Sequence, residues 1–213
     1  MKVDKDSMML YAVTDRTWLN GKSLESEVEK ICKAGATFIQ LREKGITDEE
    51  FIAEAKKIKL VTDKYKIPFV INDNIQVAKA VNADGVHIGQ SDMEAKKARA
   101  ILGEDKIIGI SAGTLNEALT AEKNGADYIG VGAMFHTDTK QDAKSVTFEE
   151  VKKITNGVNI PVVAIGGINK ENVLKLRGSG VDGIAVISAI FAENDVEEAT
   201  KNMLKLAQKM VEA

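Results

Sequence analysis

The sequence predicts a (β/α)₈ barrel, an α/β fold in which eight parallel strands close into a cylinder covered by eight helices. Short continuous apolar runs alternate strictly with helical patterns along the chain, and such runs are typical of parallel strands buried on both faces. A weak repeat precedes every second strand, as expected when alternate strands fill different layers of a barrel core. Because no linker or low-complexity tract interrupts the pattern, we expect residues 1–213 to form one domain.

The expected elements follow one another in regular order. Ser or Thr followed three residues later by Glu predicts a capped helix start at four places, residues 47, 91, 114 and 147. Helices are expected over 24–33, 48–65, 75–81, 92–102, 115–123, from 147 onward, over 169–176 and over 195–211. Strands are expected over 9–13, 38–44, 69–71, 85–88, 107–110, 128–131, 161–165 and 183–187.

The repeat combines a helix C-cap, a turn and the start of an even-numbered strand. Its four copies are Gly35-Ala36-Thr37, Asn82-Ala83-Asp84, Gly125-Ala126-Asp127 and Gly180-Val181-Asp182. The alternative fold is an open doubly wound sheet, which typically carries a Gly-rich phosphate loop after its first strand. The residues at that point are Tyr11-Ala12-Val13-Thr14, which do not form such a loop.

Composition narrows the class of protein. The net charge is −3 without a long basic run, which argues against a nucleic-acid partner. No apolar stretch reaches the roughly 18 residues of a membrane span, and the polar, acidic start is unlike a signal peptide, so we expect a cytoplasmic protein. The single cysteine, Cys32, excludes an intramolecular disulfide, and its apolar helical setting indicates a buried thiol. Self-association into a homo-oligomer remains open.

The stretch 38–44 carries the first chemical signal. Side chains alternate along an extended backbone, so Gln40, Arg42 and Lys44 should project from one face, just before Gly45. A guanidinium fork, an ammonium and an amide suit a multiply charged phosphate ester. The alternative is a surface loop with two solvated cations.

Polar residues also follow the other strands, where (β/α)₈ barrels place their active sites. Asp73 and Asp92 end neighbouring units and could share one Mg²⁺, although Asp is also common as a cap at helix starts. Gly166-Gly167 and Ile187-Ser188 form the pair of loops that commonly bind phosphate; the alternative is a tight turn and a Ser cap. Further residues at these positions are Asn72, Gln90, Ser111, Thr137, Thr139 and Lys140.

The chain has two histidines. His87 alternates with apolar neighbours, which favours an inward-facing core residue over a catalytic one, whereas His136 lies on the long loop 132–145 and could touch a substrate. No nucleophile–base pair stands out, which argues against covalent acyl transfer.

Taken together, these motifs resemble the thiamine phosphate synthase family over nearly the whole chain. The motifs are Gln-Leu-Arg-Glu-Lys at 40–44, Ile-Asn-Asp at 71–73, Gly-Val-His-Ile-Gly-Gln-Ser-Asp at 85–92, Gly-Ile-Ser-Ala at 109–112, Thr-Asp-Thr-Lys at 137–140, Ala-Ile-Gly-Gly-Ile at 164–168 and Val-Ile-Ser-Ala-Ile at 186–190. The resemblance implies a transferase that joins hydroxymethylpyrimidine diphosphate to a thiazole phosphate, releasing thiamine phosphate and pyrophosphate with the help of Mg²⁺.

The resemblance also implies roles for individual residues. Arg42, Lys44, Ser111 and Lys140 would be the catalytic groups, and Asp73 and Asp92 would hold the Mg²⁺. The pyrimidine diphosphate would be bound by Gln40, Leu41, Arg42, Glu43, Lys44, Asn72, Ser111 and Lys140, with Gln40 and Ser111 nearer the pyrimidine. The thiazole phosphate would be bound by Thr137, Asp138, Thr139, Gly167, Ile187 and Ser188. The family's mechanism is dissociative: pyrophosphate leaves first, and the thiazole nitrogen traps the resulting cation.

The chain departs from the family pattern at two places. Gly113 replaces a common histidine, and Met134-Phe135-His136 replaces the more usual Ile-Phe/Tyr-Pro, which should loosen the long loop. Two other functions stay open: a related thiazole tautomerase, which handles no diphosphate, and a non-catalytic sensor of phosphate ligands. The full set of charged groups favours the synthase over both.

Overall fold

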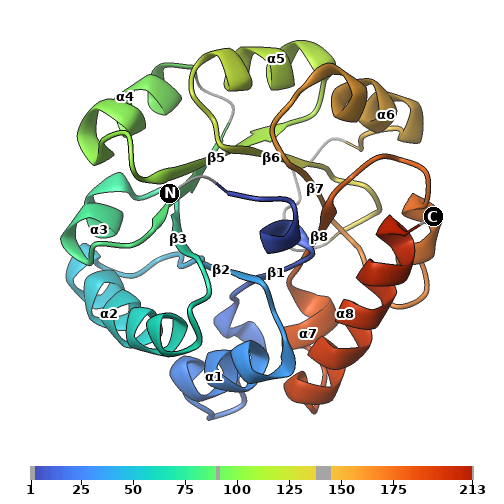
Figure 1. The fold of residues 1–213 in the computed structure, drawn as a ribbon. Helices are drawn as coiled ribbons and strands as arrows, with labels where there is room; N and C mark the ends of the chain where they lie inside the picture. Colours follow the sequence, from blue (N-terminus) through green and yellow to red (C-terminus); the bar gives the residue numbers. More distant parts are fainter. Residues whose placement is uncertain (1–2, 90–91, 138–144, 213) are drawn as a thin grey trace.

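The computed structural model describes residues 3–89, 92–137 and 145–212, and of residues 92–94 the backbone alone. Eight strands form one closed, all-parallel barrel in chain order, because β1 pairs with both β2 and β8 (Figure 1). The predicted (β/α)₈ fold class is confirmed. The strands are β1 (Leu10–Val13), β2 (Phe38–Leu41), β3 (Phe69–Asn72), β4 (Gly85–Ile88), β5 (Ile107–Ala112), β6 (Tyr128–Val131), β7 (Val162–Ile165) and β8 (Gly183–Val186).

Helices surround this cylinder on the outside (Figure 1). They are α1 (Leu24–Ala34), α2 (Asp48–Tyr65), α3 (Ile75–Ala80), α4 (Asp92–Leu102), α5 (Leu115–Lys123), α6 (Phe148–Gly157), α7 (Ser188–Phe191) and α8 (Val196–Val211). Three short 3₁₀ helices complete the described elements: η1 (Asp6–Met8), η2 (Arg16–Trp18) and η3 (Val173–Leu176).

The seventh unit differs from the prediction. The expected helix over 169–176 is wrong in extent, since only η3 forms there. The Asn169 side chain accepts from Glu171 N–H, and the Asn172 side chain accepts from Asn169 N–H, both at 2.9 Å. Together with the Val173 N–H, which donates to the Asn169 carbonyl at 3.0 Å, these bonds form a capped helix start, so a helical turn begins at Asn169 but continues only as η3.

The repeat found in the sequence closes one end of the barrel. Thr37, Asp84, Asp127 and Asp182 each accept, through a side-chain oxygen, the N–H at or next to the start of the preceding strand, at 2.8–2.9 Å. The residue two positions earlier has a positive φ in every copy: Gly35, Asn82, Gly125 and Gly180. The repeat is therefore a structural device at the amino-terminal end of the strands.

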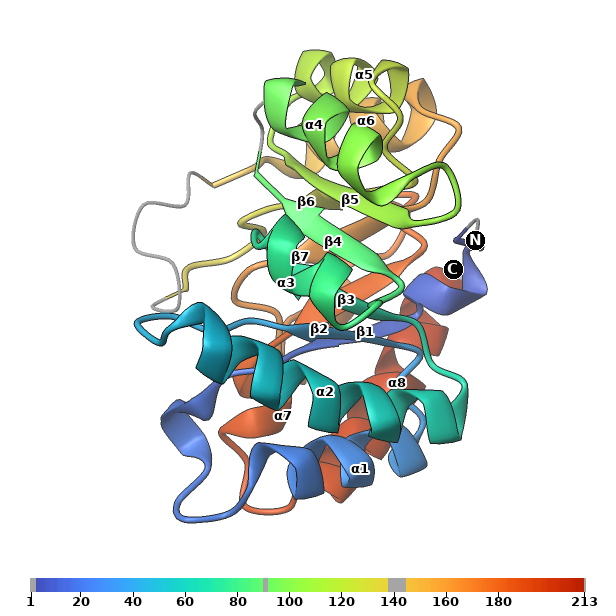
Figure 2. The same cartoon turned by 90° about the vertical axis from the view of Figure 1, so that its left-hand side faces the viewer.

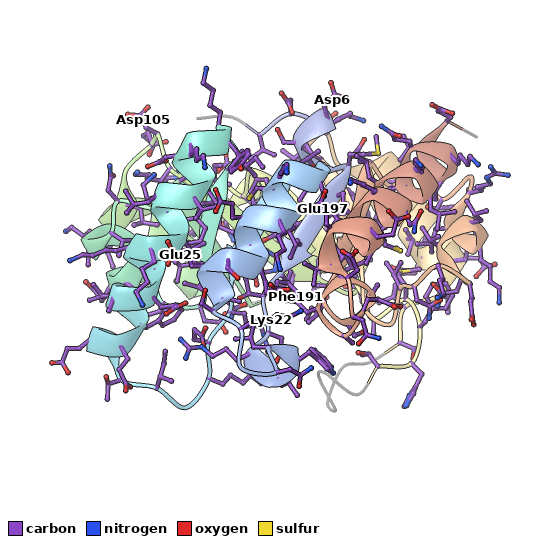
Figure 3. All side chains as sticks on the ribbon, turned by 90° about the horizontal axis from the view of Figure 1, so that it is seen from below. Asp6, Lys22, Glu25, Asp105, Phe191 and Glu197 are labelled. Atoms are coloured by element: carbon purple, nitrogen blue, oxygen red, sulfur yellow. The ribbon has the colours of Figure 1, made fainter. Side chains whose placement is uncertain are left out.

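The two ends of the barrel differ, because η1 covers one end and the loops that follow the strands surround the other. Both chain termini lie at the amino-terminal end, opposite the loops that follow the strands (Figure 2). Figure 3 shows Asp6 and Asp105 at this end and Lys22 and Phe191 toward the other. Within η1, Met8 is fully buried against the barrel interior, so this end is packed. No helix among the described residues is long and apolar enough to cross a membrane.

Candidate active site

The end of β2 positions the predicted cations. The strand stops at Leu41, three residues earlier than predicted, but the alternation of side chains continues beyond it. Gln40 is 4% exposed inside the barrel, Arg42 is half-buried and Lys44 is exposed. The Arg42 N–H donates to Thr14 Oγ1 at 3.0 Å, and its guanidinium lies 3.7 Å from Asp15. The end of β1 therefore anchors Arg42 at the mouth of the barrel.

Leu41 and Glu43 point the other way. Leu41 is buried between the barrel and its helices, and the Glu43 side chain, only 3% exposed, accepts from Arg16 Nε at 2.8 Å. Burial raises the pKa of Glu43, while the Arg16 guanidinium opposes this shift. The diphosphate contacts predicted for these two residues would therefore have to be made by their backbone.

Asp73 stands at the end of β3 in an unusual backbone conformation, with φ of 58°. The cap of α3 is Asn74, whose side chain accepts from Val77 N–H, so Asp73 does not cap that helix. Its carboxylate is exposed and accepts from Asn72 Nδ2 at 2.7 Å. A non-glycine residue in the left-handed region costs stability and is often found at functional sites.

Asp92 is the first residue of α4 in the next unit, and its side chain lies outside the described part of the structure, as does Gln90. Among described residues, no group of three or more His, Cys, Asp or Glu could hold a metal ion. An exposed carboxylate that caps no helix nevertheless suits Mg²⁺, which commonly takes one or two carboxylates and completes its shell with water and phosphate oxygens.

Ser111 belongs to a hydrogen-bonded chain inside the barrel. His87 Nε2 lies 3.0 Å from Ser111 Oγ, and His87 Nδ1 lies 2.9 Å from the Tyr128 hydroxyl. The Tyr128 and Tyr11 hydroxyls are 2.8 Å apart, and Gln40 Nε2 donates to Tyr11. The inward orientation predicted for His87 is confirmed, whereas the sequence analysis assigned no site role to Tyr11 or Tyr128. The sequence does carry a signal for both residues, because each is a tyrosine at an inward-facing position of its own strand, Tyr11 on β1 and Tyr128 on β6.

The loop after β6 is tied to the end of β7. Met134 and Phe135 donate their N–H groups to the carbonyls of Ile165 and Gly166, each at 3.0 Å. Gly167 has φ of 64°, and a Cβ added there would lie 2.2 Å from the His136 carbonyl oxygen. The missing side chain thus lets this loop approach, beyond any role in admitting phosphate. Thr137 follows half-buried, while Asp138, Thr139 and Lys140 lie outside the described residues.

The end of β8 leads into the one-turn helix α7. Ile187 occupies the cap position without a side-chain bond, and Ser188, predicted as a possible cap, is the first helical residue and exposed. The first N–H groups of a helix have no intrahelical acceptor, which makes them donors for an anion.

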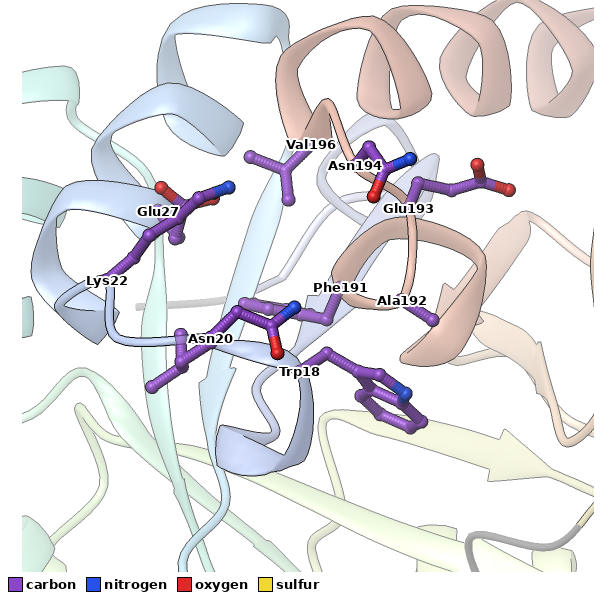
Figure 4. Close-up of a pocket in the computed structure, with 10 residues that line it drawn as sticks. Trp18, Asn20, Lys22, Glu27, Phe191, Ala192, Glu193, Asn194 and Val196 are labelled. Atoms are coloured by element: carbon purple, nitrogen blue, oxygen red, sulfur yellow. The ribbon is translucent and has the colours of Figure 1, made fainter.

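A pocket of about 250 Å³ lies elsewhere, outside the barrel between η2, α1 and the connection from α7 to α8 (Figure 4). Its lining includes Trp18, Phe191 and the buried carboxylate of Glu27, which pairs with Lys30 at 2.7 Å. None of the predicted site residues lines it. Cys32 is buried and its pKa is raised to about 12, as expected for an inert thiol.

Gln40, Arg42, Asp73, Ser111 and Ser188 come from four strand ends, those of β2, β3, β5 and β8, which a parallel barrel brings to one mouth. In (β/α)₈-barrel enzymes the active site lies at this carboxyl end of the strands. A family model for thiamine monophosphate synthase matches residues 10–190. The chain belongs to this family, and it is a transferase of thiamine biosynthesis.

Individual relatives agree over nearly the full length. The chain is 53% identical to a thiamine-phosphate synthase of Clostridium tetani, covering 91% of this chain and 93% of the relative. It is 49% identical to one of Clostridium botulinum, covering 97% of each. A solved structure of thiamine phosphate pyrophosphorylase from Pyrococcus furiosus superimposes with a TM-score of 0.89 at 41% identity, covering 97% of this chain and 98% of that one.

Proposed function

We propose that this mouth of the barrel joins hydroxymethylpyrimidine diphosphate to a thiazole phosphate and releases thiamine phosphate and pyrophosphate. One observation carries the proposal. Arg42, anchored by Thr14 and Asp15, and Asp73, a carboxylate not spent on capping, both follow strands of the same mouth. A guanidinium for the diphosphate and a carboxylate for its metal are what departure of this leaving group requires.

The protein's part in the reaction is to neutralise charge and to hold the reactants in position. The bond between the pyrimidinylmethyl carbon and the diphosphate oxygen breaks, and its electron pair leaves with pyrophosphate. Arg42, Lys44 and Lys140 would balance that charge, while Asn72 and Ser111 would donate hydrogen bonds. The thiazole nitrogen then supplies the electron pair of the new carbon–nitrogen bond. No protein base is needed, but water must be excluded, since it would trap the cation.

Asp73 and Asp92 would hold Mg²⁺ beside the diphosphate. When bound, the ion would supply further neutralisation of the leaving group. The exposed, uncapping carboxylate of Asp73 supports its half of this assignment.

The second substrate would lie against the ends of β6, β7 and β8. The N–H groups that begin α7, together with Gly167, would bind the thiazole phosphate without a cation. Thr137, Asp138 and Thr139 on the β6–α6 loop would complete this subsite, and Ile187 and Ser188 would contribute from α7. The anchoring of Met134 and Phe135 to β7 supports a loop that starts from a defined position.

The test is an endpoint assay with both phosphorylated substrates, measuring thiamine phosphate and pyrophosphate in the same sample. We expect equal amounts of the two products, formed only when Mg²⁺ is present. Folded protein that yields neither product would contradict the proposal. Such protein would next be tested for isomerisation of the thiazole phosphate alone.

A further inference from the structure

The described part of the barrel interior contains one continuous chain of five polar side chains. It runs from Gln40 on β2 through Tyr11 on β1, Tyr128 on β6 and His87 on β4 to Ser111 on β5. The three middle members contribute nothing to the reaction as proposed above. The two end members, Gln40 and Ser111, are residues that the sequence analysis predicts to meet the pyrimidine diphosphate.

The chemistry of the members sets the direction at the Gln40 end of the chain. An amide nitrogen only donates, so Tyr11 accepts from Gln40 and has its own proton left for Tyr128. If the same direction continues, Tyr128 donates to His87 Nδ1, and the imidazole proton is on Nε2, facing Ser111 Oγ; the distances of 2.9 and 3.0 Å fit either tautomer. In this arrangement each phenolic proton has a partner, and Ser111 keeps its own proton for a substrate oxygen. Burial raises the pKa of both phenols, so both stay neutral.

The surrounding backbone is shaped to hold these rings. A Cβ added to Gly109 would lie 2.1 Å from the Tyr128 ring, and one added to Gly130 would lie 3.0 Å from the His87 ring. The Phe38 ring packs against Tyr11 and Tyr128, with centroids 4.6 and 5.6 Å away. The chain is therefore a built feature with little room for alternative rotamers.

We propose that Tyr11, Tyr128 and His87 are positioning residues that hold Gln40 and Ser111 in a single donor–acceptor arrangement toward the pyrimidine diphosphate. The inference rests on the proposed function. It assigns a role to three residues that contact substrate only through the ends of the chain, and it makes Ser111 a hydrogen-bond donor to the substrate.

The first test measures the direction of the chain without any substrate. The imidazole ¹⁵N signals of His87 are resolved by NMR in the variant His136→Gln, which removes the only other histidine. We expect a single tautomer with the proton on Nε2, and a mixture of tautomers once Tyr128→Phe is added. A proton on Nδ1 in the presence of Tyr128 would overturn the proposal.

The second test is a double-mutant cycle with Ser111→Ala and Tyr128→Phe, which removes one oxygen and keeps the ring. Ser111→Ala should lower kcat/KM for the pyrimidine diphosphate by about tenfold or more in the wild type, but by less than about threefold beside Tyr128→Phe. The KM for the thiazole phosphate should not change. The matched control is Val163→Ala, an apolar change in the same interior, which should act additively with Ser111→Ala.

A further pair of variants covers the case that Tyr128→Phe does not fold. His87→Gln keeps one donor and one acceptor, so it should recover most of the kcat/KM lost in His87→Leu. Additive effects of Ser111→Ala and Tyr128→Phe, or equal losses of kcat/KM in His87→Gln and His87→Leu, would overturn the positioning role. As long as the wild type turns over, neither result would count against the proposed function. Failure of the wild type to form product would instead count against the proposed function, and the NMR test would still report on the chain.

Discussion

Asp73 is a single residue whose backbone conformation costs stability while its carboxylate is proposed to serve function. Its φ of 58° is a conformation that most side chains disfavour, and its carboxylate caps no helix and is exposed to solvent. The Asp73 N–H donates to the His87 carbonyl at 2.9 Å and holds the residue at the end of β3, which fits a carboxylate positioned for a ligand.

We expect Asp73→Gly to reduce turnover at saturating Mg²⁺ on the order of 100-fold, because a metal-binding carboxylate is lost. The free energy of unfolding should stay within about 1 kcal/mol of the wild type, since relief of the left-handed strain offsets the larger entropy of an unfolded glycine. Steady-state kinetics and urea unfolding measure the two effects.

Lys66→Gly is the matched control, because Lys66 is an exposed residue with φ of 56° at the end of α2. It should retain full activity. If Asp73→Gly instead turned over at the wild-type rate, the assignment of Asp73 as a ligand of Mg²⁺ would be wrong.

At this scale, the sequence predicts the direction of a side chain where the alternation along a strand sets it. It does not predict side-chain contacts that depend on how distant elements pack together. Alternation along β2 was enough to predict that Gln40 and Leu41 face opposite ways. It could not show that Glu43 is buried against Arg16, since that depends on α2 and η2. The pairing of Tyr11 with Tyr128 joins residues 117 positions apart and depends on closure of the barrel.

At the scale of elements, the four-fold repeat ties each odd-numbered strand to the even-numbered strand after it. We expect Asp84→Ala to lower the free energy of unfolding by about 1–3 kcal/mol, because the N–H of Phe69 loses a charged acceptor. Activity should persist below the melting temperature, since the change lies at the end of the barrel away from the site.

Asp84→Asn keeps an oxygen acceptor and should recover part of the lost stability, as urea titrations of both variants would show. A fall in kcat/KM in either variant, with the protein fully folded, would contradict a purely structural role for the repeat.

The contact between the β6–α6 loop and the end of β7 leads to a second element-scale prediction. In Gly167→Ala the new Cβ must displace the His136 carbonyl, and with it the start of the loop proposed to meet the thiazole phosphate. We expect the KM for the thiazole phosphate to rise about tenfold or more, because small displacements of positioning groups are costly. The KM for the pyrimidine diphosphate should change less.

Gly178→Ala supplies the control for backbone strain, because Gly178 has φ of 71° but nothing within 4 Å of an added Cβ. It should lose stability without a change in either KM. Equal effects of the two variants on the thiazole phosphate KM would mean that the loop contact has no functional part.

The order of elements was predictable because each apolar run and capping sequence is local. For the seventh unit the start was predictable, because the Asn169 side chain caps the turn that follows, but a local pattern does not reveal that the helix beyond it is only the short 3₁₀ helix η3. The short helix α7 was also missed, since four residues carry no periodic signal.

In the whole molecule, the structural repeat lies at the amino-terminal end of the strands and the proposed site lies at their carboxyl end. Apolar residues fill both the barrel interior and the layer between strands and helices, and every strand pairs with two neighbours. We infer that residues 1–213 form one domain.

Removal of Mg²⁺ with EDTA should abolish turnover and lower the melting temperature only slightly, because an ion bound by two carboxylates at the mouth adds only its binding free energy to the stability of the fold. Calorimetry with and without EDTA checks this, and re-addition of Mg²⁺ should restore activity. A large drop in melting temperature would show instead that the ion supports the fold.

Both substrates are proposed to bind at the carboxyl end of the barrel strands. Amide hydrogen exchange measured with and without thiamine phosphate, pyrophosphate and Mg²⁺ together tests this proposal most directly. We predict slower exchange over residues 41–45, 72–74 and 187–189, with no change in the repeat at 35–37, 82–84, 125–127 and 180–182. Slower exchange confined to the repeat, or to the pocket beside Trp18 and Phe191, would contradict it.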